Sequence, residues 1–183
     1  MQISVVTSNK GKFLEIKEIL KKFGLQSIQE PIETKEDWNT LEERCLSKAK
    51  DAFSKLQKPL IVDDTGLFFE AFENFPGPFP KMVFSELGFD GIFKKLEGKS
   101  RNAQFKTLIC YTNGKIKKLF EGDLNGRISE KIFDGGHESL PYDRIFIPDG
   151  YSVPFCLISD AEKNKISHRA KAVEGFAKWF SKN

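Results

Sequence analysis

The stretch Leu60–Phe69 constrains the fold more than any other part of the chain. Three apolar residues run into two adjacent carboxylates, Asp63 and Asp64, and a second apolar run follows Gly66. This pattern predicts a short buried strand that stops at a charged tip. Ligands usually bind at the carboxyl ends of strands in α/β sheets, so the two carboxylates would reach a cleft. A turn or a helix cap accounts for the same residues equally well, because Asp and Thr are common in both.

A strand, a polar turn and a helix open the chain. Residues Ile3–Val6 are apolar, and the polar segment Thr7–Lys12 follows them. A helix is then predicted up to Gly24, because apolar residues recur at steps of three and four. The free N–H groups at its start suit a phosphate, although the P-loop pattern is absent. The alternative is a plain N-cap with solvated lysines.

A second helix is predicted over residues 40–56, after a possible short strand around residues 27–29. Lys48 lies three residues after Cys45 and four before Ala52, two members of its apolar stripe. It therefore borders the buried face of the helix. Such a lysine either snorkels past its apolar neighbours to solvent or holds an anion.

The middle of the chain predicts an antiparallel hairpin. Residues 103–111 alternate as a strand, residues 112–115 form a hairpin turn, and a partner strand follows from Ile116 towards Ile128. A helix is expected over residues 81–96. An antiparallel pair in an otherwise strand–helix chain indicates an α+β (mixed α/β) fold with one mixed sheet. At 183 residues the chain is expected to be a single domain, residues 1–183.

Composition and charge narrow the function classes. The net charge of +3 is too mild to favour nucleic acid or a membrane surface over a small anionic ligand. No apolar run reaches the length of a membrane span, and no signal-peptide pattern is visible. Cys45, Cys110 and Cys156 are widely spaced in apolar company, which predicts reduced, buried thiols in a cytoplasmic protein.

The C-terminal segment places two basic residues at a helix start. Ser167 is a reasonable N-cap, so His168 and Arg169 would occupy the first turn. Basic residues there oppose the helix dipole, and a nearby anion would offset that cost. His137 lies in a polar loop and is expected to be solvated. The turn Thr7–Lys12, the helix lysine Lys48, the acids Asp63 and Asp64 and the pair His168–Arg169 together make up the expected parts of a nucleoside triphosphate site.

Four ordered motifs resemble those of the Ham1-like family of inosine triphosphatases, which are pyrophosphatases of non-standard purine nucleoside triphosphates. The motifs cover nearly the whole chain: Thr7–Lys12 resembles T-[GS]-N-x-x-K, Asp63–Leu67 resembles acid-acid-[ST]-G-L, Phe75–Gly77 resembles [FL]-P-G, and Lys163–Arg169 resembles K-x-x-x-S-H-R. Agreement of four motifs in the same order is specific, and chance does not account for it.

This resemblance implies an elongated mixed sheet flanked by helices in two lobes, with a central nucleotide cleft. It also implies a homodimer, with contacts from the Pro-Gly loop and the helix after it. The implied reaction is Mg²⁺-dependent hydrolysis of ITP, dITP or XTP to the monophosphate and pyrophosphate. Substrate contacts are implied for Thr7, Ser8, Asn9, Lys10, Lys12, Lys48, Thr65, Leu140, Pro141, Tyr142, Asp143, Lys163, His168 and Arg169. Metal ligation is implied for Glu36, Asp63 and Asp64, whose oxygen donors suit Mg²⁺, and Asp64 would accept the proton of the attacking water.

One departure from the family pattern concerns the base. The family typically has G-F-G-Y-D-P where this chain has Ser139–Arg144. Leu140 lacks the ring that would stack on a base, and Pro141 removes a backbone N–H. Two alternatives to the pyrophosphatase therefore stay open: a nucleotide-binding or sensing protein with little turnover, and a Maf-like nucleotide pyrophosphatase, which the motif Ser167–Arg169 disfavours.

Overall fold

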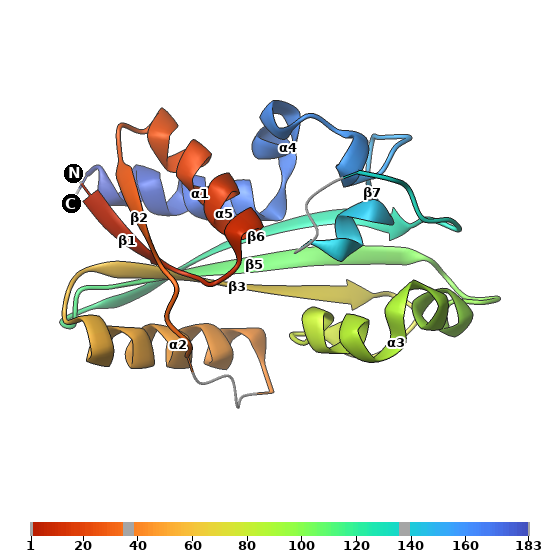
Figure 1. Cartoon of the computed structure of the whole chain (residues 1–183), viewed down its shortest axis with the longest axis horizontal. Helices are drawn as coiled ribbons and strands as arrows, with labels where there is room; N and C mark the ends of the chain where they lie inside the picture. The colour runs from red at the N-terminus through yellow and green to blue at the C-terminus, as the bar shows by residue number, and fades with distance from the viewer. Residues whose placement is uncertain (1, 35–38, 136–139, 183) are drawn as a thin grey trace.

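One mixed sheet runs through the molecule (Figure 1). The computed structural model describes residues 2–34, 39–135 and 140–182, and within them the sheet has seven strands. Its order is β2 (Gln26–Glu30), β1 (Gln2–Val6), β3 (Leu60–Phe69), β5 (Asn102–Thr112), β6 (Lys117–Ile128) and β7 (Phe146–Pro148), with β4 (Pro76–Gly77) paired to β3 outside this path. β1 is parallel to β2 and β3, and the other pairs are antiparallel. The predicted mixed α+β fold is confirmed.

Helices cover both faces of this sheet. α1 (Lys10–Lys22) and α5 (His168–Phe180) lie on one face, and α2 (Leu41–Leu56) lies on the other (Figure 1). α3 (Pro80–Lys95) covers the far end of the long strands, where the short helices η1 (Pro141–Arg144), η2 (Phe155–Leu157) and α4 (Asp160–Ile166) also lie on the α1 side. Residues that alternate along a strand point to opposite faces, so Ile61 packs with α1 and α5 while Val62 packs with α2.

The strand predicted to end at the two carboxylates does not end there. β3 continues unbroken to Phe69 and pairs with β5 in register along its whole length, with Asp63 opposite Ile109 and Thr65 opposite Thr107. The expectation of a charged strand tip is therefore wrong, because Asp63 and Asp64 lie in the middle of a central strand. Their side chains alternate, and each carboxylate enters a different layer of the molecule.

The other predicted elements are confirmed with adjusted limits. The first helix begins at Lys10 rather than after the polar turn, and the helix predicted over residues 81–96 contains a non-helical kink at Gly88, whose φ is 58°. α4 was not predicted, because its seven residues are too few for a clear apolar stripe. Cys45 and Cys110 are buried as expected, whereas Cys156 is partly exposed. None of the described helices is long and apolar enough to cross a membrane.

Candidate functional site

Asp63 is held between two cations. Arg169 at the start of α5 donates from Nε to Asp63 Oδ2 over 3.0 Å, and the Lys12 ammonium from α1 pairs with Oδ1. The carboxylate is 2% exposed. Burial alone would raise the pKa of Asp63, but the adjacent charges of Lys12 and Arg169 hold that pKa well below its usual range. Asp63 is therefore a permanently charged part of this network.

The ion-pair network extends from Asp63 towards η1. Arg169 also pairs with Glu15 of α1, and Lys163 of α4 bridges Glu15 at 2.5 Å and Asp143. Burial opposes ionisation of Glu15, yet Arg169 and Lys163 lower its pKa. Asp143 shares Lys163 with Glu15, and burial raises the pKa of Asp143. Five charged side chains, one each from β3, α5, α1, α4 and η1, thus form one continuous chain of alternating sign.

A line of hydrogen bonds runs beside these charges. The Thr65 hydroxyl lies 2.8 Å from that of Thr107, which lies 2.7 Å from Nδ1 of His168. Lys12 and Arg169 both donate to the Thr65 oxygen, over 3.4 and 3.2 Å. Thr107 is completely buried and His168 is 3% exposed. The predicted residues Lys12, Thr65, His168 and Arg169 therefore meet on this face of β3.

Asp64 lies on the opposite face, against α2. Arg44 donates from Nε to Asp64 Oδ2 over 3.2 Å, and Lys48 Nζ lies 3.7 Å from Oδ1. Lys48 also donates to the carbonyl of Asp63 over 3.4 Å. The guanidinium of Arg44 stacks over the ring of Phe79 at 4.8 Å. Lys48 therefore faces protein acceptors on β3, and its role at a substrate anion stays a prediction.

The polar turn before α1 is a helix cap. The Asn9 side chain accepts from the N–H of Lys12 over 3.0 Å, and Thr7 Oγ1 accepts from the N–H of Asn9 over 3.2 Å. Ser8 and Lys10 are exposed. The N-cap alternative therefore holds for Asn9, and the same turn still presents Ser8 and Lys10 to solvent beside the Asp63 network.

A cavity of about 400 Å³ opens between α1, η1, η2 and α4. It is lined by Gly11, Leu14, Glu15, Glu18, Leu140, Asp143, Phe155, Cys156, Ile158, Asp160, Lys163 and Asn164. Leu140, Asp143 and Lys163 thus meet as the resemblance implies. Tyr142 does not join them: its ring packs edge-on against Phe84, and its hydroxyl donates to the carbonyl of Pro80 over 3.1 Å. Pro141 lies beside it in η1.

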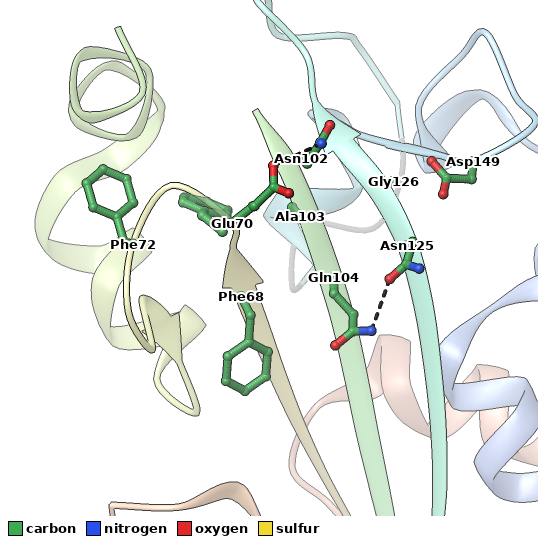
Figure 2. Close-up of a pocket in the computed structure, with 10 residues that line it drawn as sticks. Phe68, Glu70, Phe72, Asn102, Ala103, Gln104, Asn125, Gly126 and Asp149 are labelled. Atoms are coloured by element: carbon green, nitrogen blue, oxygen red, sulfur yellow. Dashed lines mark hydrogen bonds between the residues drawn. The ribbon is translucent and has the colours of Figure 1, made fainter. Parts of the chain in front are cut away.

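A larger cavity, of about 540 Å³, lies at the far end of β3, β5 and β6. Figure 2 shows its lining, in which the Gln104 amide donates to Asn125 over 3.0 Å, with Glu70 and Asp149 nearby. None of the residues predicted from the motifs lines it. The smaller cavity, which adjoins the charged network, is the better candidate for the site.

The metal prediction is only partly covered by the structure. Glu36, like His137, lies outside the described residues. Among the residues that are described, no three His, Cys, Asp or Glu side chains gather as a metal site. Asp63 and Asp64 point to opposite faces of β3, so one ion does not reach both carboxylates in this arrangement.

Three site residues were missed by the sequence reasoning. Arg44 stands four residues before Lys48 and Glu15 three after Lys12, so both share a helix face with a predicted residue. That spacing could have found them. Thr107 carries no such signal, because a threonine in an alternating strand is ordinary and only the register with Thr65 reveals its position.

Comparisons with known proteins identify the family of the chain. A model of the Ham1 family matches residues 3–179. A protein of Saccharolobus solfataricus named dITP/XTP pyrophosphatase is 44% identical, covering 98% of this chain and 93% of its own length, and one of Methanopyrus kandleri with the same name is 39% identical, covering 100% and 98%. The solved HAM1 protein from Coxiella burnetii has the same fold, with a TM-score of 0.82, 23% identity and full coverage of both chains. The chain belongs to the Ham1 family.

Proposed function

We propose that this protein hydrolyses non-standard purine nucleoside triphosphates such as dITP, XTP and ITP to the monophosphate and pyrophosphate. The observation that carries the proposal is the gathering of Lys12, Lys163 and Arg169 around buried carboxylates next to a cavity of about 400 Å³. Lys48 stands beside Asp64 on the other face of β3. That volume suits a small-molecule ligand. The names of the relatives, at up to 44% identity over nearly the full chain, support the same reaction.

The triphosphate would lie at the start of α1. Ser8 and Lys10 are exposed there, and the N-terminus of a helix favours negative charge. Lys12 stands one turn further on, where it already holds a carboxylate. Hydrolysis to pyrophosphate breaks the bond between the α- and β-phosphates, and the cations would stabilise the negative charge that the leaving pyrophosphate acquires.

Asp64 is the residue we assign to the attacking water, and Mg²⁺ is the proposed cofactor. Asp64 and Glu36 would hold the ion, because Mg²⁺ prefers a few carboxylate oxygens and keeps several waters. Asp64 Oδ1 accepts the backbone N–H of Thr65 over 3.1 Å and lies 3.7 Å from Lys48 Nζ, so its second lone pair is the one that would take the ion. When bound, the ion would neutralise phosphate charge. Asp64 would accept a proton as the water oxygen bonds to phosphorus.

The base would enter the cavity beside η1. Lys163 lines it as a donor, with Leu140 supplying apolar contact. A pocket that donates to a keto oxygen accepts hypoxanthine or xanthine. The amino group of adenine would leave such a donor unpaired, which costs binding and rate.

Pyrophosphate release tests the proposal directly. The purified protein is incubated with Mg²⁺ and, in turn, dITP, XTP, ITP, ATP and GTP, with Asp64→Asn as the inactive control. We expect release from dITP, XTP and ITP to exceed that from ATP by at least about tenfold. Binding of these nucleotides without any release would instead identify a nucleotide-binding or sensing protein.

We also propose a homodimer. Met82 and Leu87 of α3 are 52% and 37% exposed, and apolar exposure of this kind on one helix is typical of an interface. α3 follows the Pro-Gly loop that the resemblance associates with dimer contacts. Light scattering coupled to size exclusion measures the mass, and a monomer at all concentrations would contradict this proposal.

A cytoplasmic location is proposed from the cysteines. Cys45, Cys110 and Cys156 are all free in the structure. Burial raises the pKa of Cys110 to about 11, so its thiol is unreactive. Free thiols of this kind are typical of a reducing compartment.

A further inference from the structure

The proton positions along the line Thr65–Thr107–His168 follow from chemistry. Lys12 and Arg169 carry only donors, and both approach the Thr65 oxygen. That oxygen has two lone pairs, so it accepts from both cations and its single hydroxyl hydrogen remains for Thr107. The Thr107 oxygen therefore accepts from Thr65, and its own hydrogen goes to Nδ1 of His168, 2.7 Å away.

If the hydrogen bonds ran in the opposite direction, the donors and lone pairs at Thr65 would not match. If His168 donated from Nδ1, Thr107 would donate to Thr65. Thr65 would then receive three donors with two lone pairs, and no described acceptor is recorded for its own hydrogen. One direction alone satisfies all three side chains.

We propose that Thr107 is a positioning residue that holds His168 as the neutral tautomer protonated at Nε2. His168 then offers one fixed N–H donor, for which no hydrogen bond to another described residue is found. His168 does not itself line the cavity of about 400 Å³, and we take the nucleotide to be the partner of this donor. That use by substrate rests on the function proposed above, whereas the tautomer does not. Arg169 and Lys12, which also pair with Asp63, determine the direction of these hydrogen bonds because both donate to the Thr65 oxygen.

Packing around the ring gives this assignment its geometric support. His168 stacks on Phe105 with ring centroids 4.6 Å apart and planes 20° apart. Gly122 lies beside Thr107 in the β5–β6 register, and a Cβ atom added there would come within 2.1 Å of the His168 carbonyl oxygen. The first turn of α5 thus packs directly against the sheet beside Thr107. This packing and the stacking on Phe105 hold the imidazole with its Nδ1 towards Thr107.

The electrostatic surroundings agree with a neutral ring. Burial and the positive charges of Arg169, Lys163 and Lys12 outweigh the nearby Asp63 and lower the pKa of His168 well below its ordinary value. A neutral imidazole has one donor and one acceptor nitrogen, and Thr107 decides which is which.

The tautomer is measurable without any assay of activity. The chain has two histidines, so ¹⁵N-histidine labelling of the whole protein gives two ring systems, and His137→Gln assigns them. Near neutral pH we expect unprotonated Nδ1 and protonated Nε2 for His168 in the wild type and in Thr107→Ser, which keeps the hydroxyl. Thr107→Val, close in shape, should give mixed tautomers. A wild-type ring protonated at Nδ1, or a Thr107→Val ring unchanged from wild type, would overturn the inference.

Kinetics then test the use of the donor. Thr107→Val should lower kcat/KM for XTP about tenfold, as for loss of one oriented hydrogen bond, while Thr107→Ser stays within about twofold. Thr112→Val is the matched control, because Thr112 is a buried hydroxyl at the other end of β5 that bonds only to its own hairpin. Equal losses in Thr107→Val and Thr112→Val would reject a positioning role. Absent turnover of every triphosphate by a wild type with the expected tautomer would reject the proposed function alone.

Discussion

Two neighbouring aspartates on β3 have different surroundings and therefore different expected roles. Asp63 is enclosed by Lys12 and Arg169, whereas Asp64 has one hydrogen-bonded cation, Arg44, and a distant contact with Lys48. A carboxylate with two close cations is structural in character, because its charge is fully used within the protein. Asp64 accepts the Thr65 N–H at Oδ1 and has only one close cation, so it is the carboxylate that we assign to the attacking water.

Substitution of each aspartate by asparagine separates these roles. Asp63→Asn leaves Lys12 and Arg169 without their buried counter-charge, so the free energy of unfolding should fall by about 3–5 kcal/mol. Asp64→Asn also leaves the buried Arg44 without its counter-charge, so stability should fall there too, but this variant should in addition abolish turnover. Urea unfolding and pyrophosphate release measure the two effects. Surviving activity in Asp64→Asn would contradict the assignment of the base.

The pH dependence of stability tests the buried imidazole. The unfolded His168 gains a proton below its ordinary pKa of 6.5, whereas the folded ring has a much lower pKa and stays neutral. The unfolded state therefore binds more protons, and the free energy of unfolding falls as the pH falls from about 7 to about 5. Asp63 and Glu15 have lowered pKa values, and their contributions are lost only below the ordinary values of 3.8 and 4.5.

Comparison with a variant isolates this contribution from other groups. Burial raises the pKa of Asp143, which opposes the trend because protonation then favours the folded state. The free energy of unfolding is therefore measured in urea at about pH 7 and about pH 5 for the wild type and for His168→Gln. Asp143 contributes equally to both proteins, so its effect cancels when the two pH-dependent changes are subtracted. The loss on acidification should be smaller in His168→Gln, and equal losses in the two proteins would mean that His168 is not buried neutral.

At the level of elements, the sequence predicts the strands and helices well and the position of the charges poorly. Apolar periodicity is local, so it identified the limits of α2 and the β5–β6 hairpin. The two acids on β3 read as a strand end because a bare carboxylate does not belong inside a sheet. Cations from α1, α2 and α5 allow these two carboxylates to be buried within the sheet. These helices are distant in sequence from β3, so periodicity does not reveal the pairing.

The α2 helix gives a test of a residue that the motifs did not include. Arg44→Gln removes the guanidinium from Asp64 and from the Phe79 ring, so turnover should fall by about tenfold or more. Lys50→Gln, an exposed change on the same helix, should leave the rate unchanged. Steady-state pyrophosphate release compares them, and an unimpaired Arg44→Gln would exclude Arg44 from the site.

At the scale of the whole molecule, the central strands carry two apolar regions separated by a polar belt. Ile61 and Val62 belong to the clusters under α1, α5 and α2, whereas Leu67 belongs to the cluster under α3. Between them on β3 lie Asp63–Gly66, and Thr107 lies opposite on β5. The motif resemblance implied a cleft in this region, and the belt explains why no single core spans the sheet.

Amide hydrogen exchange tests whether the two regions open separately. We expect Leu67 and Phe69 to exchange through a lower-energy opening than Ile61, because their apolar cluster is separate from that of Ile61 and the polar belt lies between the two. Binding of XTP without metal should slow exchange across the belt. Identical opening energies at both ends, followed over a range of denaturant, would show one cooperative unit instead.

The ion pairs on the two faces of β3 have a kinetic consequence. The paired groups are five cations and four carboxylates: Lys12, Arg44, Lys48, Lys163 and Arg169 with Glu15, Asp63, Asp64 and Asp143. These groups carry a net charge of only +1, because nearly every positive charge stands beside a carboxylate, so their field at a distance is weak. A nucleotide would therefore find its partners already oriented but would receive little long-range attraction. The association rate of the substrate should therefore depend only weakly on ionic strength. The choice between nucleotides would then be made by contacts formed after binding.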